Sequence, residues 1–154
     1  MDRAEYAAKL FYDGYNCAQA LTVAFRDVTG LEESFSAKMA SSFGGGMGRM
    51  REVCGAVSGM LMVAGIVYGY DSTGDDESKK AHYQLVQHLA GQFREQVGSI
   101  VCREILQNAG LSGDKGGEAE ARTAEYYEKR PCPDLVYLAA EVLGEMLVEK
   151  GILK

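Results

Sequence analysis

The chain has 154 residues, of which 47% are hydrophobic and 25% charged, and its formal net charge is −6 at pH 7. These values are typical of one globular domain with one core, over residues 1–154, and exclude a disordered chain. Because nucleic acids and anionic membranes require clustered Lys and Arg, the acidic balance and the absence of a basic cluster argue against both as partners.

Apolar residues at helical spacing predict the elements of the N-terminal half. A helix is expected over residues 3–12, and a second over residues 17–29 begins after Asn16, whose side chain suits an N-cap. A third runs over residues 34–43 and ends in the glycine run 44–48. That run lacks the strand before it and the Lys-Ser/Thr after it that a phosphate-binding loop needs, so we expect a tight turn there.

Residues 53–69 form the most apolar segment of the chain and are also rich in Gly, Ala and Ser. Small residues let other helices approach the backbone closely, so this segment is predicted to be a central helix packed on all sides. Its length is near the minimum for a membrane span, but it contains a cysteine, a serine and several glycines and lacks Trp or Lys anchors. We therefore expect no membrane span.

The C-terminal half continues the helical pattern. A helix ending at Val97 is followed by a short one that contains Cys102 and has Ser99 as its cap. Residues 118–129 are predicted to form a solvent-facing helix, and the last helix begins at Cys132 between two prolines, which suit a first turn. No segment alternates polar and apolar residues with period two. The sequence therefore predicts an all-α, single-domain bundle of about six to seven helices.

Four isolated cysteines stand at or within one turn of predicted helix N-termini: Cys17, Cys54, Cys102 and Cys132. The partial positive charge of a helix N-terminus lowers the pKa of a thiol placed there, which favours thiolate chemistry. Short connections make successive helices antiparallel, and one helix separates each cysteine-bearing helix from the next. These four helices are therefore expected to run parallel and to bring their thiols to one end of the bundle.

Basic residues lie close in sequence to three of the four cysteines. Such charges favour thiolates, or offset the negative charge of a four-thiolate metal centre. We therefore treat all four cysteines as candidate catalytic thiols, cofactor ligands or metal ligands. The basic neighbours are Arg49 and Arg51 before Cys54, Arg103 after Cys102, and Lys129 and Arg130 before Cys132.

The order and spacing of the cysteines, with a Cys-Gly-Ala-x-x-Gly motif at residues 54–59, resemble the C_GCAxxG_C_C family of redox-active bacterial and archaeal proteins. Residues 14–19 and 43–48 are similar to the flanking motifs of that family, so the resemblance covers nearly the whole chain. It implies a redox or prosthetic-group role, with an iron–sulfur cluster as the candidate cofactor. It also implies a redox partner, either an oxidoreductase or a transporter system.

Two kinds of thiol site stay open at this point. Four thiolates suit an iron–sulfur cluster, zinc or another thiolate-bound metal, although the close Cys-x-x-Cys pairs of most such sites are absent. Otherwise no cofactor is needed, and one low-pKa thiolate attacks while a second resolves the disulfide. Cys54 is the candidate attacking residue, because Arg51 and several glycines leave its surroundings basic and open. His82 and His88 are interpreted as surface or half-buried helix residues and not as ligands.

A third interpretation belongs to a different class of protein. The chain would be a helical structural or interaction module, homodimeric through its small-residue faces, with buried and inert cysteines. Tyr15, Tyr126 and Tyr127 are expected to pack in the core or to wall a pocket near the thiols. The first residues have no basic and apolar regions of a secretory signal, so we expect a cytoplasmic location.

Overall fold

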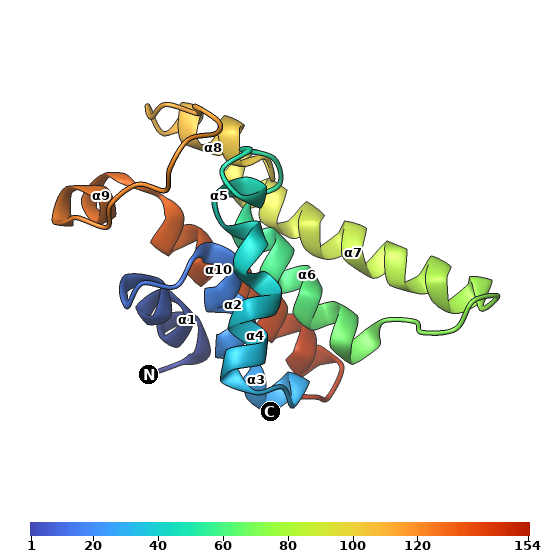
Figure 1. The fold of residues 1–154 in the computed structure, drawn as a ribbon. Coiled ribbons are helices and arrows are strands. Elements are labelled where there is room, and N and C mark those ends of the chain that lie inside the picture. Colours follow the sequence, from blue (N-terminus) through green and yellow to red (C-terminus); the bar gives the residue numbers. More distant parts are fainter.

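The computed structural model describes residues 1–154 and confirms the all-α class (Figure 1). None of the helices combines the length and the apolar character that crossing a membrane requires. The first half contains α1 (Arg3–Tyr12), α2 (Cys17–Ala24), α3 (Arg26–Thr29), α4 (Glu33–Ala40), the 3-10 turn η1 (Ser41–Phe43), α5 (Gly44–Met47) and α6 (Gly55–Tyr68). The second half contains α7 (Asp76–Val97), α8 (Cys102–Asn108), α9 (Ala124–Lys129) and α10 (Cys132–Glu149).

The core lies where α1, α2, α6 and α10 pack against one another (Figure 1). Along α6 only Ile66 is exposed, which agrees with the predicted central helix. The long helix α7 buries only Leu89, Ala90 and Phe93, so it covers the core with one stripe and leaves its other faces in solvent. The core thus rests on four helices, three of which begin at or next to a cysteine.

The helix predicted over residues 17–29 is interrupted at Phe25, which separates α2 from α3. The carbonyl oxygen of Ala24 accepts a 2.8 Å hydrogen bond from the guanidinium of Arg3, whose Cζ atom lies 4.8 Å from the centre of the Phe25 ring. The amide of Val28 bonds to Phe25 instead of Ala24, at 2.9 Å. A tertiary contact therefore takes over a carbonyl that a continuous helix would have used.

The helix predicted over residues 118–129 starts later than expected, although most of its residues do face solvent. Helix α9 begins only at Ala124, after Thr123, whose hydroxyl accepts the amide N–H of Tyr126 at 3.1 Å. The preceding residues 111–123, called here the connecting segment, contain no helix. Tyr126 and Tyr127 are half-buried because their rings pack against Phe11 of α1.

Candidate thiol site

All four cysteines line a single cavity of about 50 Å³. Cys17, Cys102 and Cys132 are the first residues of α2, α8 and α10, and Cys54 is the N-cap of α6. The expected position at helix N-termini is therefore observed for each of them. The four cysteine-bearing helices do not all pack side by side, because α2, α6 and α10 pack together whereas α8 packs on α5 at one end of the molecule (Figure 1).

The start of α2 is fixed by a reciprocal cap between Asn16 and Gln19, and Asn16 was predicted to be the N-cap from the sequence. The Asn16 side chain accepts the amide N–H of Gln19 at 2.8 Å, and the Gln19 side chain accepts the amide N–H of Asn16 at 3.0 Å. This capping box satisfies two backbone donors and sets Cys17 at the first helical position. At α10, Pro131 and Pro133 flank Cys132 in the first turn, where a missing N–H costs nothing.

The glycine that follows Cys54 lets α6 start directly against α2. A Cβ atom on Gly55 would lie 2.8 Å from the carbonyl oxygen of Phe43 and 3.0 Å from the Cβ of Cys17. Both distances are shorter than ordinary carbon contacts, so any larger residue would push the two helix starts apart. The Cys-Gly pair of the motif thus brings the Cys17 and Cys54 positions together.

Cys102 reaches the cavity through two backbone hydrogen bonds. The amide N–H of Cys102 donates to the carbonyl of Glu52 at 2.6 Å, and the amide N–H of Cys54 donates to the carbonyl of Ile100 at 2.7 Å. The pair forms an isolated antiparallel bridge centred on Val53 and Val101. The predicted Ser99 cap is wrong, because Val101 is the N-cap and the Ser99 hydroxyl binds the Val101 amide at 2.9 Å, outside the helix.

The glycine run forms a turn of left-handed backbone beside the thiols. Residues 45–49 all have φ between 61° and 69°. For Met47 and Arg49 this conformation costs roughly 1–2 kcal/mol each, because their Cβ atoms crowd the following carbonyl. Gly46 cannot be replaced without disturbance, since a Cβ there would lie 2.7 Å from the Cβ of Cys102. The turn therefore allows close contact with α8 and directs the chain toward Cys54, as expected from the sequence.

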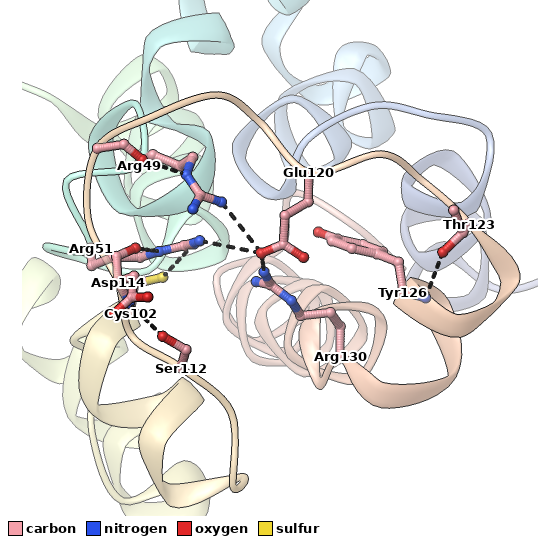
Figure 2. A network of polar contacts seen from close by, with 10 residues as sticks. Arg49, Arg51, Cys102, Ser112, Asp114, Glu120, Thr123, Tyr126 and Arg130 are labelled. Carbon is pink, nitrogen blue, oxygen red and sulfur yellow. Dashed lines mark hydrogen bonds and ion pairs between the residues drawn. The ribbon is translucent and has the colours of Figure 1, made fainter.

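Three arginines converge on the carboxylate of Glu120, which belongs to the connecting segment (Figure 2). Its Oε1 atom lies 3.3 Å from Nη1 of Arg49 and 3.8 Å from Nη2 of Arg51, and it also accepts from Nη2 of Arg130. Nη1 of Arg51 in addition lies 3.7 Å from the sulfur of Cys102. Arg49, Arg51 and Arg130 were expected near thiols, and of these Arg51 and Arg130 line the thiol cavity whereas Arg49 does not.

Arg122 is a cavity residue that sequence reasoning missed. Its guanidinium donates to the carbonyls of Phe11 and Tyr15, both at 3.1 Å, and its Cζ atom lies 4.2 Å from the centre of the Phe11 ring. No sequence pattern marks it, because its partners lie about a hundred residues away along the chain. Of the predicted tyrosines, Tyr126 lines the cavity with Arg122.

Other residues singled out from the sequence lie elsewhere. Arg103, Tyr15 and Tyr127 are not among the residues that line the cavity. Lys129 pairs with Glu125 at 2.6 Å on the exposed side of α9. His82 and His88 lie on α7, outside the cavity, where His82 is half-buried and His88 is exposed.

The four thiols differ in their ionisation. The pKa of Cys132 is lowered to about 7, first by its hydrogen bond with the Cys17 thiol and then by the charge and hydrogen bond of Arg130, against the opposing effect of burial. The same hydrogen bond and burial raise the pKa of Cys17 well above its ordinary value. The pKa shifts therefore favour the negative charge on Cys132, beside Arg130 and Arg122, and the proton on Cys17.

The expected open surroundings of Cys54 are wrong. Its side chain is only 4% exposed, and burial raises the pKa of its thiol to about 12. Arg51, its basic neighbour in sequence, turns toward Cys102 instead. Burial also raises the pKa of Cys102, with Arg51 opposing the effect. Of the four thiols, Cys132 is therefore the one suited to be a thiolate near neutral pH.

The donor set of the cavity has the composition of a metal centre but not its geometry. Four thiols line one cavity, which is the donor number of zinc sites and of many iron–sulfur clusters. However, no group of three or more His, Cys, Asp or Glu side chains is arranged to hold one metal ion. As placed here, the residues do not fit the expected metal or cluster.

The fold and the cavity together define a class, that of helical proteins in which cysteines from distant helix starts form one thiol site. Comparison with protein families identifies one family within this class. The family described as “Putative redox-active protein (C_GCAxxG_C_C)” matches residues 15–146, and the chain belongs to this family. No curated protein and no solved structure matches the chain.

Proposed function

We propose that the protein carries out thiol/disulfide chemistry, with Cys132 as the attacking thiolate and Cys17 as the resolving thiol. The observation that carries this proposal is that Cys17 and Cys132, the first residues of α2 and α10, line one cavity with Arg122 and Arg130, where the pKa of Cys132 is lowered to about 7 and that of Cys17 is raised. A thiol with a pKa near ambient pH combines a useful thiolate fraction with high nucleophilicity. The membership of a redox-active family supports the same class of chemistry.

The reaction proceeds in two balanced steps. The Cys132 thiolate attacks one sulfur of a disulfide RSSR, which forms a mixed disulfide and releases RS⁻. The sulfur of Cys17 then attacks Cys132 and forms the Cys17–Cys132 disulfide, while the second RS⁻ leaves with the Cys17 proton as RSH. The substrate disulfide is reduced and the protein is oxidised by two electrons. A dithiol or another two-electron reductant returns the protein to its starting state.

Side chains around the pair support these steps. Arg130 and Arg122 stabilise the starting thiolate, and their charges also favour the leaving RS⁻. Cys17 lines the same cavity as Cys132, and its thiol is the largest cause of the lowered pKa of Cys132, which supports a second step between these two sulfurs. We therefore expect the mixed disulfide to be short-lived in the unmodified protein.

The test is to treat the reduced protein with one equivalent of a small disulfide and to map the products by mass spectrometry. We expect a Cys17–Cys132 disulfide, a trapped mixed disulfide on Cys132 in the Cys17→Ser variant, and no adduct at that position in Cys132→Ser. A disulfide that forms instead between Cys54 and Cys102, or four thiols that do not react until the protein is denatured, would overturn the proposal. The second result would favour the inert structural module.

A thiolate-bound iron–sulfur cluster is the second candidate function. It is favoured by one observation, the presence of all four cysteines around one cavity. Since no three of them are arranged for one ion, cluster binding requires the helix starts to move closer together. Anaerobic purification followed by iron and acid-labile sulfide analysis tests it. Stoichiometric iron and sulfide in the protein would overturn the dithiol proposal. If the protein is incubated with iron and sulfide and retains neither, the dithiol proposal stands.

A further inference from the structure

A second cavity, of about 310 Å³, adjoins the thiol cavity and is lined by four arginines. We call it the arginine pocket and define it by Arg49, Arg51, Arg122, Arg130 and the single carboxylate Glu120. The two cavities share Asn16, Gly45, Arg51, Arg122, Tyr126 and Arg130, so a group bound in one lies next to the thiols of the other.

The charge of the pocket is out of balance. Four arginines and one carboxylate line it, in a chain whose net charge is −6, and the other negative charge beside these arginines is the Cys132 thiolate of the thiol cavity. Arg51 and Arg130 have side chains that are only 4% and 8% exposed, so water screens their charges poorly. Arg122 is turned toward neutral carbonyl groups and has no carboxylate of its own. Four positive charges beside one carboxylate and one thiolate are only partly compensated, which is costly where they are buried, and an added anion would relieve that cost.

Glu120 occupies the pocket as an internal anion that can be displaced. One of its oxygens, Oε1, forms ion pairs with the guanidinium groups of Arg49, Arg51 and Arg130. Its side chain is nevertheless 45% exposed, and its backbone makes no backbone–backbone hydrogen bond within the connecting segment. A bound carboxylate or phosphate would offer the arginines the same acceptor atoms, and more of them.

The connecting segment is attached to the same arginines by its backbone. Nε of Arg49 donates to the carbonyl of Gly116 at 2.8 Å, and Nε of Arg51 donates to the carbonyl of Asp114 at 3.1 Å. Both bonds leave one terminal nitrogen of each arginine directed at Glu120, Nη1 of Arg49 and Nη2 of Arg51. The segment can therefore stay attached while the Glu120 carboxylate gives up its place.

We propose that the arginine pocket binds the carboxylate, phosphate or sulfate group of the small disulfide or thiol that reacts at Cys132, and that Glu120 holds this place until the ligand displaces it. The identity of the reacting group rests on the proposed dithiol function. Anion binding itself does not, because it depends only on the arginines and Glu120. The test is designed so that the two can fail separately.

The first experiment measures anion binding without any thiol reaction. Thermal unfolding of the reduced protein is followed against inorganic phosphate, with chloride at equal ionic strength as the reference. A ligand that binds only the folded state raises the unfolding temperature, and the stabilisation grows with the logarithm of one plus the ratio of ligand concentration to Kd. We expect a phosphate-specific rise that is larger in Glu120→Gln, where the internal competitor is gone. Glu118→Gln, which removes the same charge from the same segment, should behave as the unmodified protein. Equal responses to phosphate and chloride in Glu120→Gln would refute the pocket.

The second experiment compares disulfides of similar size and different charge. Dithiodipropionate, hydroxyethyl disulfide and cystamine are anionic, neutral and cationic, and their rates of reaction with the reduced protein are measured by thiol loss. We expect the anionic compound to react at least about tenfold faster than the neutral one, the cationic one to be slowest, and the advantage to fall with salt. Arg49→Gln should reduce the advantage, whereas Arg94→Gln, on the exposed side of α7, should not.

The outcomes of the two experiments separate the two proposals. Equal rates for all three disulfides would reject the arginine pocket as the substrate site while leaving the dithiol function intact. No reaction with any of them, together with a phosphate-specific rise in unfolding temperature, would reject the dithiol function and retain the anion site.

Discussion

Gly59 of α6 lies so close to Ala18 of α2 that a Cβ atom at position 59 would stand 2.6 Å from the Ala18 carbonyl oxygen. The same atom would lie 2.8 Å from the Cβ of Leu21. These distances explain why the motif ends in glycine. The contact sets the separation of the two helices whose starts carry Cys17 and Cys54.

Replacement of Gly59 by alanine is expected to destabilise the protein, because α2 and α6 must separate to make room. Overpacking of this kind costs about 1–3 kcal/mol. Gly65→Ala is the matched control on the same helix, since a Cβ there meets nothing within 4 Å. It should be neutral or stabilising by about 0.5–1 kcal/mol, because alanine is the better helix former. Urea unfolding measures both, and equal effects of the two changes would contradict the close contact.

The ionisation of Cys132 is expected to depend on Cys17. Thiolate absorbance or the pH dependence of alkylation should give a midpoint near pH 7 for Cys132. Cys17→Ala removes the hydrogen-bond donor and should move this midpoint up toward the ordinary value of 9.0, whereas Cys17→Ser should restore part of the difference. A midpoint that is the same in all three proteins would show that Cys17 is not the main cause.

Arg130 is expected to hold the pKa of Cys132 down as well, by its charge and its hydrogen bond. Arg130→Gln should raise the pKa of Cys132 and slow its reaction with disulfides at pH 7, because less thiolate is present. Arg130→Lys keeps the charge and should have the smaller effect on the pKa. Because Arg130 also binds Glu120, the unfolding temperature of each variant is measured alongside the pKa. A loss of stability with an unchanged pKa would assign Arg130 a structural role only.

Stability is expected to fall at alkaline pH because of Cys54. Above its ordinary value of 9.0 the thiol ionises in the unfolded chain, whereas in the folded protein its pKa is raised to about 12. The folded state binds the extra proton, so the free energy of unfolding decreases by about 1.4 kcal/mol per pH unit in this window. Cys54→Ser removes this contribution and should give a shallower decline between about pH 9 and 11. An unchanged slope would contradict the burial of a protonated thiol.

Cys132 contributes to the pH dependence with the opposite sign. Because its folded-state pKa is lowered from 9.0 to about 7, it adds stability that is fully present above pH 9 and is lost as the pH falls through 7. The stability profile should therefore rise from pH 7 toward 9 before Cys54 and Cys17 bring it down. Cys132→Ser should flatten the rising part in a urea-unfolding series.

Local features of the chain were predictable from the sequence. The Asn16 cap, the apolar segment that became α6 and the position of each cysteine at a helix start follow from neighbours within one or two turns. The interruption at Phe25 and the late start of α9 could not be predicted from the sequence. They involve contacts from another helix, since Arg3 of α1 bonds to the Ala24 carbonyl and Phe11 of α1 packs against Tyr126. Residues 118–123 have helical composition but no helix neighbour that buries an apolar face there.

The sequence by itself determined that four thiols stand at helix starts, that the fold is helical and that small residues let its helices meet. Only the tertiary structure decided which thiol is ionised. It buried Cys54, turned Arg51 toward Cys102 and brought Arg122 and Arg130 to Cys132. The physical reason is that a pKa depends on burial and on charges a few ångströms away in space, whatever their separation along the chain.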